Sequence, residues 1–297
     1  MIEADEYDTA FFDKRSKFIH YHPDVLVINN IEYDHADIFH DLDAIRAQFH
    51  NLVRIMPENS KIIYPLEDDE IEKVIKMGCW TPTETVLGAG ADWSILDPSN
   101  DYRHFSILKN NGESAKVSWS IFGEHNACNA LAAVVAAHNV GVTVQKACEA
   151  LSKFKSVKRR LECIYQSNDI TVYDDFAHHP TAIKKSLQAI KSIVKSGRLI
   201  VIMEPRSNSM RMGVHADRLS SAFIDADQIF LFQPKDLNWS IVDYMKELGG
   251  RCRIFEDIDK MIDLVSKETL PHDHIVFMSN GAFGNAHQKL INRLGEL

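Results

Sequence analysis

Apolar residues follow two different periods along the second half of the chain. Continuous apolar runs, rich in branched and aromatic residues, predict buried strands at 169–174, 198–203, 228–233, 251–255 and 274–280. Between them, apolar residues recur every three or four positions and predict amphipathic helices at 179–197 (ended by Gly197), 215–226, 239–248, 257–268 and 285–294. Strands that alternate with helices at this spacing predict an α/β fold with a parallel, doubly wound sheet.

The first half of the chain combines strand and helix patterns with a hairpin. The predicted elements are a buried strand at 24–30, helices at 41–56, 125–141 and 143–153, and a hairpin at 101–123 that turns at Asn111-Gly112. The acidic run 66–73 is expected to be the solvated face of a helix. The basic stretch 153–162 is the predicted linker, so we expect domains of residues 1–156 and 157–297.

Composition and charge narrow the kinds of partner that suit the chain. Its 297 residues are 45% hydrophobic and 25% charged, and the net charge of −9, without a dense basic block, argues against nucleic acid or an anionic membrane as partner. The five cysteines are scattered without a C-x-x-C pair, which favours reduced thiols in a cytoplasmic protein. Residues 1–10 carry four acids and no basic residue, unlike a signal peptide, and the most apolar stretch, 130–137, is too short to span a bilayer.

Two acids and two histidines follow the first predicted strand of the second half. Asp174, Asp175, His178 and His179 lie where this strand ends and a helix begins. Ligands of open α/β sheets bind beyond the carboxyl ends of the strands, so this position favours a functional site. The alternative is a polar loop in which His179 lies near the helix N-cap and Pro180 starts the first turn.

Two acidic segments of the first half are candidate cation sites. Residues 3–8 include Glu3 and three other acids, and hard cations such as Mg²⁺ take oxygen ligands of this kind. Residues 29–41 follow a predicted strand and include His35 and Asp37, which could contribute to a metal or phosphate site. An acidic surface loop is the alternative for the first segment, and a helix-capping loop is the alternative for the second.

Polar groups at a helix start and two arginines are candidates for binding anions. His125, Asn126 and Asn129 lie at the start of a predicted helix, where free backbone amides favour anions, although Asn126 could simply cap the helix. Arg160 and Arg206 could each grip a phosphate or a carboxylate with two hydrogen bonds. An exposed surface role is the alternative for each arginine.

The order of five segments resembles the Mur ligase family, whose members join amino acids or peptides to the muramic-acid precursors of bacterial peptidoglycan. The segments, which extend over the whole chain, are EADEYD, NNIEYDHAD, GEHNACNALAA, KRRLE and DDFAHHPTA. The last segment resembles the branch that acts directly on UDP-N-acetylmuramate. The segments EADEYDTAFFDKRSKF and EPRSNSMRMGVH are most similar to the enzymes of that branch that attach L-alanyl-γ-D-glutamyl-meso-diaminopimelate to UDP-N-acetylmuramate in peptidoglycan recycling.

Alanine-adding enzymes of the same branch are the alternative, but they usually carry a PHRY-like segment where this chain has PRSN. The resemblance implies an α/β fold in which a mixed-sheet remainder of the central ATP-binding domain precedes a Rossmann-like domain with a mainly parallel sheet. The chain contains no G-x-x-G-K-[ST] motif. We therefore expect it to be the C-terminal part of a ligase and not to turn over ATP alone.

The resemblance also implies roles for individual residues, with ATP and Mg²⁺ as cofactors. Glu3 and His35 would bind Mg²⁺, whereas His125, Asn126 and Asn129 would line the nucleotide site. Arg160 would reach the phosphates, and Asp175 would hold the ribose or orient the nucleotide. Arg206 and Asn208 would contact the incoming peptide or the nucleotide. His178 and His179 are grouped with the catalytic residues because they mark the subfamily, but no separate role follows for either.

The implied partners are the small-molecule substrates UDP-N-acetylmuramate and the tripeptide, with no obligate protein partner. A metal-dependent hydrolase that uses His35, Asp37, His178 and His179 is the alternative enzyme class, and stoichiometric zinc or manganese in the purified protein would favour it. A peptide- or nucleotide-binding module without catalysis is the other alternative. Titration with the tripeptide and with ATP would distinguish such a module.

Overall fold

The computed structural model describes residues 1–9, 13–167 and 169–295. These residues form two compact units, residues 1–154 and residues 155–297. The division lies two residues before the boundary that the sequence predicts. Each unit contains its own six-stranded sheet and its own hydrophobic core.

The first unit is built on a mixed sheet. Its strands follow the order β1-β2-β3-β4-β5-β6, with parallel pairing as far as β4 and antiparallel pairing from β4 to β6. The strands are β1 (Val25–Val27), β2 (Lys61–Pro65), β3 (Thr83–Val86), β4 (Trp93–Leu96), β5 (His104–Lys109) and β6 (Ser114–Ser118). The helices are α1 (Leu42–Ile55), α2 (Asp69–Lys76), α3 (Glu124–Asn139) and α4 (Val144–Leu151), and residues 17–20 form a 3₁₀ turn.

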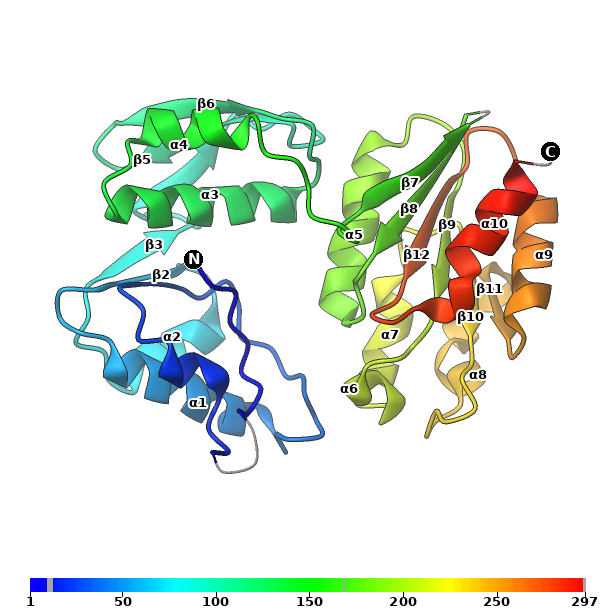
Figure 1. Ribbon diagram of the computed structural model, residues 1–297, viewed down its shortest axis with the longest axis horizontal. Helices are drawn as coiled ribbons and strands as arrows, with labels where there is room; N and C mark the ends of the chain where they lie inside the picture. The colour runs from blue at the N-terminus through cyan, green and yellow to red at the C-terminus, as the bar shows by residue number, and fades with distance from the viewer. Residues whose placement is uncertain (10–12, 168, 296–297) are drawn as a thin grey trace. The chain divides into compact units, whose positions relative to one another are not determined.

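Helices cover both faces of this first sheet. Ile62 and Ile63 are neighbours in β2 and point to opposite faces, because side chains alternate along a strand. Ile62 packs in one cluster with Ile45 of α1 and Ile71 of α2, whereas Ile63 packs in another cluster with Leu131 of α3. Figure 1 shows α1 and α2 on one side of β2 and β3, with α3 and α4 on the other. The unit is therefore a three-layer α/β structure.

The second unit is built on a mainly parallel sheet. Its strands follow the order β11-β10-β9-β12-β8-β7, and only the pair of β7 with β8 is antiparallel. The strands are β7 (Glu162–Ser167), β8 (Ile170–Asp175), β9 (Leu199–Met203), β10 (Gln228–Phe232), β11 (Cys252–Phe255) and β12 (His274–Met278). The helices are α5 (Pro180–Ile193), α6 (Asn208–Arg211), α7 (Ala216–Ala222), α8 (Ile241–Tyr244), α9 (Ile258–Glu268) and α10 (Ala286–Leu294), with 3₁₀ segments at 246–251 and 283–285.

Buried residues of α9 and α10 pack on one face of this second sheet. Ile262 and Leu290 join the cluster that contains Phe230 of β10 and Phe277 of β12. Figure 1 shows α9 and α10 on this side and α5 on the opposite side of the sheet. The α/β fold class and the mainly parallel second sheet predicted from the sequence are confirmed.

Several predicted elements differ from the structure at their ends. The strand expected at 24–30 is only Val25–Val27 and is half-buried, and the helix expected to end at Gly197 already ends at Ile193. Gly197 instead forms a turn with φ +84°, where a Cβ would lie 1.9 Å from the backbone oxygen of His272. The helix expected at 239–248 is shortened to α8 and is followed by a 3₁₀ segment at 246–251, in which Gly249 has the non-helical φ of +54°.

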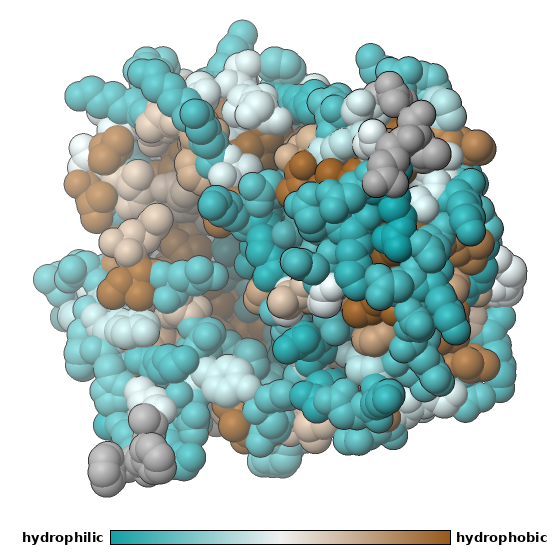
Figure 2. Space-filling view, turned by 45° about the vertical axis from the view of Figure 1, so that its right-hand side comes forward, coloured by the Kyte–Doolittle hydropathy of each residue, from teal (hydrophilic) through white to brown (hydrophobic). Residues whose placement is uncertain are grey.

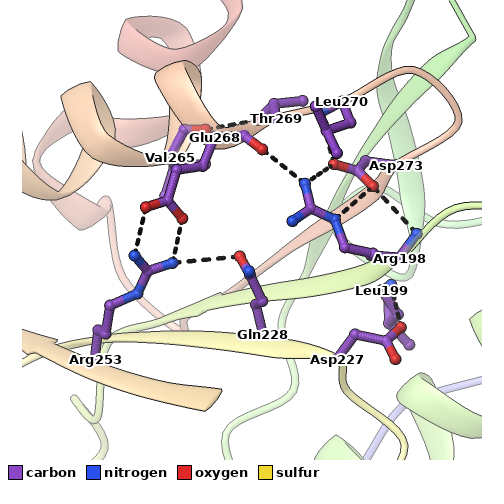
Figure 3. Close-up of polar contacts among 10 residues, drawn as sticks. All are labelled: Arg198, Leu199, Asp227, Gln228, Arg253, Val265, Glu268, Thr269, Leu270 and Asp273. Carbon is purple, nitrogen blue, oxygen red and sulfur yellow. Dashed lines mark hydrogen bonds and ion pairs between the residues drawn. The ribbon is translucent and has the colours of Figure 1, made fainter. Parts of the chain in front are cut away.

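Charged side chains fasten the amino-terminal edge of the second sheet (Figure 3). The buried carboxylate of Asp273, just before β12, accepts hydrogen bonds from Nε, Nη2 and the backbone N–H of Arg198, just before β9. Arg198 Nη2 also donates to the backbone oxygen of Glu268 at 2.7 Å. The side chain of Glu268 accepts from Arg253, whose guanidinium lies 4.4 Å from the Phe230 ring centroid. These contacts join three strands to the end of α9.

The surface of the described residues gives no sign of a membrane-spanning helix. None of the helices within these residues is long and apolar enough to cross a bilayer. The part of the surface on the right of Figure 2 is mostly hydrophilic, with hydrophobic residues in small separate groups.

Candidate active site

The carboxyl ends of three neighbouring strands bring polar residues together in the second unit. Met278 of β12 pairs with Asp175 of β8 on one side and with Met203 of β9 on the other. The residues that follow these positions, Glu204 and Ser279, are therefore neighbours at one edge of the sheet. This is the edge at which open α/β sheets bind ligands.

The side chain of Asp175 is buried at this edge of the sheet. The residue is 3% exposed, and its two carboxylate oxygens accept from the backbone N–H of Ala177 (2.7 Å) and from Oγ of Ser186 (2.9 Å). Burial raises the pKa of Asp175, although these hydrogen bonds and the charge of Arg160 oppose the shift. In this arrangement Asp175 fixes the turn from β8 into α5, so any effect on a ligand passes through that turn.

Asp174 contacts an arginine and a histidine instead. Its Oδ2 lies 3.2 Å from Nε of Arg159, and its Oδ1 lies 3.2 Å from Nε2 of His287 in α10. Partial burial alone would raise the pKa of Asp174, but the hydrogen bonds and charges of His287 and Arg159 outweigh burial and lower it. Asp174 therefore acts as an anchor for the segment that carries Arg160.

Arg159 attaches the KRR segment, residues 158–160, to the second sheet. Its Nη2 donates to the backbone oxygens of Ser279 (2.5 Å) and Gly281 (3.0 Å), and its backbone has the left-handed φ of +58°. The guanidiniums of Arg159 and Arg160 lie 5.3 and 5.5 Å from the centroid of the Phe176 ring. Arg160 is exposed, so its charge is accessible beside the anchored Arg159.

The two histidines of this loop occupy different positions. His179 is the N-cap of α5, where Nδ1 accepts from the backbone N–H of Thr181 at 3.3 Å, and Pro180 begins the helix. The ring of His179 also stands edge-on to the buried ring of His215, with centroids 4.5 Å apart. Nδ1 of His178 lies 3.0 Å from the backbone oxygen of Phe176. The structure thus gives His179 the local capping role that the sequence offered as an alternative.

Arg206 and Asn208 lie just beyond the end of β9. Arg206 is exposed, and its Nη1 is 3.7 Å from Oε1 of the buried Glu204. Asn208 is the exposed first residue of α6, whose N-cap is Ser207. Arg206 therefore belongs to the same sheet edge as Asp175.

The candidate cation ligands lie in the first unit. Glu3 is exposed, and Nε2 of His35 lies 3.4 Å from Oε1 of Glu6. His35 has the left-handed φ of +53°, its backbone N–H donates to Asp34 Oδ1 at 2.7 Å, and its ring stands edge-on to the Tyr7 ring at 4.4 Å. Burial raises the pKa of Glu6, although a backbone hydrogen bond and the charge of His35 oppose the shift.

The carboxylates of residues 3–8 are oxygen donors of the kind that Mg²⁺ prefers. Among residues 1–9, 13–167 and 169–295, no cluster of three or more histidine, cysteine, aspartate or glutamate side chains is arranged so that it could hold a metal ion. Protein sites for Mg²⁺ often supply only one or two side chains, while phosphate and water complete the octahedron. The carboxylate of Glu3 fits such a role, whereas the imidazole of His35 is a nitrogen donor more typical of transition metals, and its Nε2 faces Oε1 of Glu6.

The predicted nucleotide residues lie in the first turns of α3. Gly123, with φ +94°, is the N-cap, so the expectation that Asn126 could cap the helix is wrong. Asn126 instead donates from Nδ2 to the backbone oxygen of Phe122 at 2.8 Å. His125 is partly buried and Asn129 is exposed, one turn apart on the helix. The positive end of the helix dipole thus lies beside polar side chains, an arrangement that suits an anion.

Family models match both units of the chain. The Mur ligase middle domain matches residues 1–137, and the Mur ligase glutamate ligase domain matches residues 159–281. The chain belongs to the Mur ligase family. This confirms the resemblance that the five sequence segments suggested.

Individual Mur ligases are similar to nearly the whole chain. The UDP-N-acetylmuramate–L-alanyl-γ-D-glutamyl-meso-2,6-diaminoheptandioate ligases of Haemophilus influenzae and Escherichia coli are 44% identical over 295 residues and 45% identical over 297 residues. The crystal structure of a murein peptide ligase from Psychrobacter arcticus has a TM-score of 0.73 and 42% identity, and the match covers 99% of this chain and 62% of that one. The chain spans 65% of the length of these two curated relatives.

Several residues at the carboxyl edge of the second sheet were not among the candidates predicted from the sequence. Four of them follow or face the end of a strand, namely Glu204, Ser279, Gly281 and His287. The fifth, Arg159, directly precedes Arg160 in the chain. Glu204 directly follows the predicted strand 198–203, which is a sequence signal for this edge, whereas Ser279 lies inside the run 274–280 that was predicted as strand. No sequence signal identifies the contact of Arg159 with the backbone of Gly281, because it depends on β12 lying next to β8.

Proposed function

We propose that this chain is part of an ATP-dependent ligase that joins L-alanyl-γ-D-glutamyl-meso-diaminopimelate to UDP-N-acetylmuramate in peptidoglycan recycling. The observation that carries the proposal is the 44–45% identity, over nearly the whole chain, to ligases named for these substrates. The PRSN segment that contains Arg206 also distinguishes the chain from the alanine-adding branch.

The proposed reaction activates the lactyl carboxylate of UDP-N-acetylmuramate as an acyl phosphate. The carboxylate attacks the γ-phosphate of ATP and displaces ADP. The neutral alanyl amine of the tripeptide then attacks the acyl carbon, and the tetrahedral intermediate expels phosphate while the amine nitrogen loses a proton to solvent. Such a reaction brings several anions together, so the protein contributes mainly positive charge and positioning. Arg160 supplies positive charge from an exposed position, and Asp175 fixes the turn from β8 into α5 beside it.

Residues of the first unit would serve the nucleotide and its cation. Glu3 and His35 would hold Mg²⁺, which when bound neutralises phosphate charge. His125, Asn126 and Asn129 would line the nucleotide site from the start of α3. Arg206 and Asn208, in the second unit, would contact the incoming peptide, with the guanidinium of Arg206 binding a peptide carboxylate.

We place this reaction in the bacterial cytoplasm, with small-molecule substrates and no obligate protein, nucleic-acid or membrane partner. ATP and UDP-sugars are cytoplasmic metabolites, and the free cysteines suit a reducing compartment. The net charge of −9 supports the absence of a nucleic-acid partner.

Calorimetric titration of the purified chain tests the assignment of the substrate. We expect the tripeptide to bind, L-alanine to bind much more weakly, and Arg206→Ala to weaken binding of the tripeptide. Binding of L-alanine in preference to the tripeptide would indicate the alanine-adding activity instead. Stoichiometric zinc or manganese in the same preparation would support a metal-dependent hydrolase.

A further inference from the structure

Gly281 leaves room for the side chain of Arg206. A Cβ on Gly281 would lie 2.3 Å from Cδ, 2.4 Å from Nε and 2.8 Å from Cζ of Arg206. The φ of Gly281 is outside the left-handed region, so its backbone does not require glycine. The absence of a side chain at this position therefore serves space rather than conformation.

The turn that contains Gly281 is fixed from several directions. The backbone oxygens of Ser279 and Gly281 both accept from Nη2 of Arg159, and the backbone N–H of Ser279 donates to the backbone oxygen of Asp175 at 3.2 Å. The N–H of Gly281 donates to Oγ of Ser279 at 3.0 Å, and Ser279 is fully buried. A collision at Gly281 is therefore more easily relieved by movement of Arg206 than by movement of this turn.

The side chain of Arg206 can move more easily than the turn that contains Gly281, and the same turn also influences Arg206 through Glu204. Its side chain is 53% exposed and its ion-pair partner is Glu204, at 3.7 Å. The other carboxylate oxygen of Glu204 accepts from Oγ of Ser279 at 2.9 Å. Ser279 thus orients Glu204, Glu204 attracts the guanidinium of Arg206, and Gly281 provides the space in which Arg206 lies.

We propose that Ser279 and Gly281 are positioning residues that set the location of the Arg206 guanidinium and thereby the binding of the peptide carboxylate. The part that concerns the peptide rests on the proposed function, whereas the part that concerns the position of Arg206 does not. Neither residue touches substrate in this scheme. Both act through Arg206.

The test compares Gly281→Ala with Gly250→Ala, a matched control at a glycine of the same unit where an added Cβ meets nothing within 4 Å. In protein labelled with ¹⁵N-arginine, we expect the Nε–H resonance of Arg206 to shift in Gly281→Ala and to stay unchanged in Gly250→Ala. We expect Gly281→Ala to weaken binding of the tripeptide about ten- to hundredfold, as loss of a charge-assisted hydrogen bond does. The double variant Gly281→Ala/Arg206→Ala should bind no more weakly than Arg206→Ala alone.

An unchanged Arg206 resonance in Gly281→Ala would overturn the positioning proposal. If Gly281→Ala folds poorly, Arg206→Ala in the same chain should restore its melting temperature, because the collision partner is gone, and failure to restore it would also count against the proposal. If the unmodified chain does not bind the tripeptide, the proposed peptide site is wrong. The arginine spectrum still decides whether Gly281 positions Arg206.

Ser279→Ala gives a second measurement that adds no atom to the site. It removes the hydrogen bond to Glu204 and the one that Ser279 Oγ accepts from the Gly281 N–H, and it keeps the backbone oxygen that accepts from Arg159. We expect it to shift the same Arg206 resonance and to weaken tripeptide binding less than Gly281→Ala does. Identical spectra for Ser279→Ala and the unmodified chain would remove Ser279 from the proposal.

Discussion

Asp174 and Asp175 are adjacent in β8, and their pKa values are shifted in opposite directions. Successive side chains of a strand point to opposite faces, so the two carboxylates enter different surroundings. Asp174 lies between Arg159 and His287, which lower its pKa despite partial burial. Asp175 is buried among uncharged donors, and burial raises its pKa despite their hydrogen bonds. The two carboxylates therefore contribute to stability with opposite dependence on pH.

Asp174→Asn is expected to lower the melting temperature at pH 7. The pKa of Asp174 is lower in the folded than in the unfolded chain, so its stabilising effect is complete above the ordinary aspartate pKa of the unfolded chain. The effect is lost as the pH falls through the lower, folded pKa. Loss of about 1 kcal/mol would lower the melting temperature by about 3 °C. Thermal denaturation between pH 3 and pH 7 should show the difference from the unmodified chain shrinking at the acidic end.

Asp175→Asn is expected to melt at the same or a higher temperature than the unmodified chain at pH 7. An amide can still accept from Ala177 and donate to Ser186, and it avoids burying a charge. Because the pKa of Asp175 is raised on folding, the unmodified chain gains stability as the pH falls through that raised pKa. Its melting temperature should therefore approach that of the variant at lower pH, and a gap that widens on acidification would contradict this account.

Arg160→Ala should impair catalysis far more than folding. Its guanidinium is exposed and packs on Phe176, so we expect a change in melting temperature of less than about 2 °C. In a complete ligase that contains this chain, loss of a charge that stabilises transferring phosphate should reduce turnover about 10²- to 10³-fold. Ligation at a near-normal rate would remove Arg160 from the site.

The 297 residues are expected not to hydrolyse ATP on their own. They contain no G-x-x-G-K-[ST] sequence, whose lysine and hydroxyl bind the β/γ-phosphates and Mg²⁺. Phosphate release from ATP in the presence of Mg²⁺ is the direct measurement, and Glu3→Ala is the matched variant. Magnesium-dependent hydrolysis that disappears in Glu3→Ala would show that the expectation is wrong.

Arg198→Met should destabilise the second unit without changing the peptide site. It leaves the carboxylate of Asp273, whose side chain is 1% exposed, without its cationic partner, which typically costs about 3 kcal/mol. Arg253→Met is the matched control, because its ion pair with Glu268 is about one-third exposed on both sides and should contribute about 1 kcal/mol or less. Urea denaturation measures both, and calorimetry should find tripeptide binding unchanged in each variant.

Elements with a strong local pattern were predictable from the sequence. β8, β9, β10 and β12 are apolar runs, and α1, α5 and α9 have a continuous apolar face. β2, β3 and β4 were missed because each has only four or five residues. β3 is held by pairing with β2 and β4 by pairing with β5, and Val86 and Trp93 join the cluster that contains Leu131 of α3, so tertiary context decides these strands.

Only those features of the candidate site that depend on a single segment of the chain could be predicted from the sequence. Asp175 could be found because it lies at the carboxyl end of β8, and Arg206 because it lies in the loop just beyond β9, where ligands bind. The anchoring of Arg159 and the space at Gly281 depend on β12 lying between β8 and β9, which no local pattern specifies. The histidine pair shows the same limit, because the contact of His179 with His215 joins the starts of two helices separated in sequence.

The amino-terminal fastening of the second sheet by Arg198 and Asp273 has a consequence for how such a unit can evolve. The Arg198–Asp273 contacts lie at one edge, whereas Arg206 and Gly281 lie at the other. Substitutions of an exposed residue such as Arg206 can then alter substrate choice without disturbing the Arg198–Asp273 contacts. A library randomised around Arg206 should accordingly yield many folded proteins, and one randomised around Asp273 should yield few.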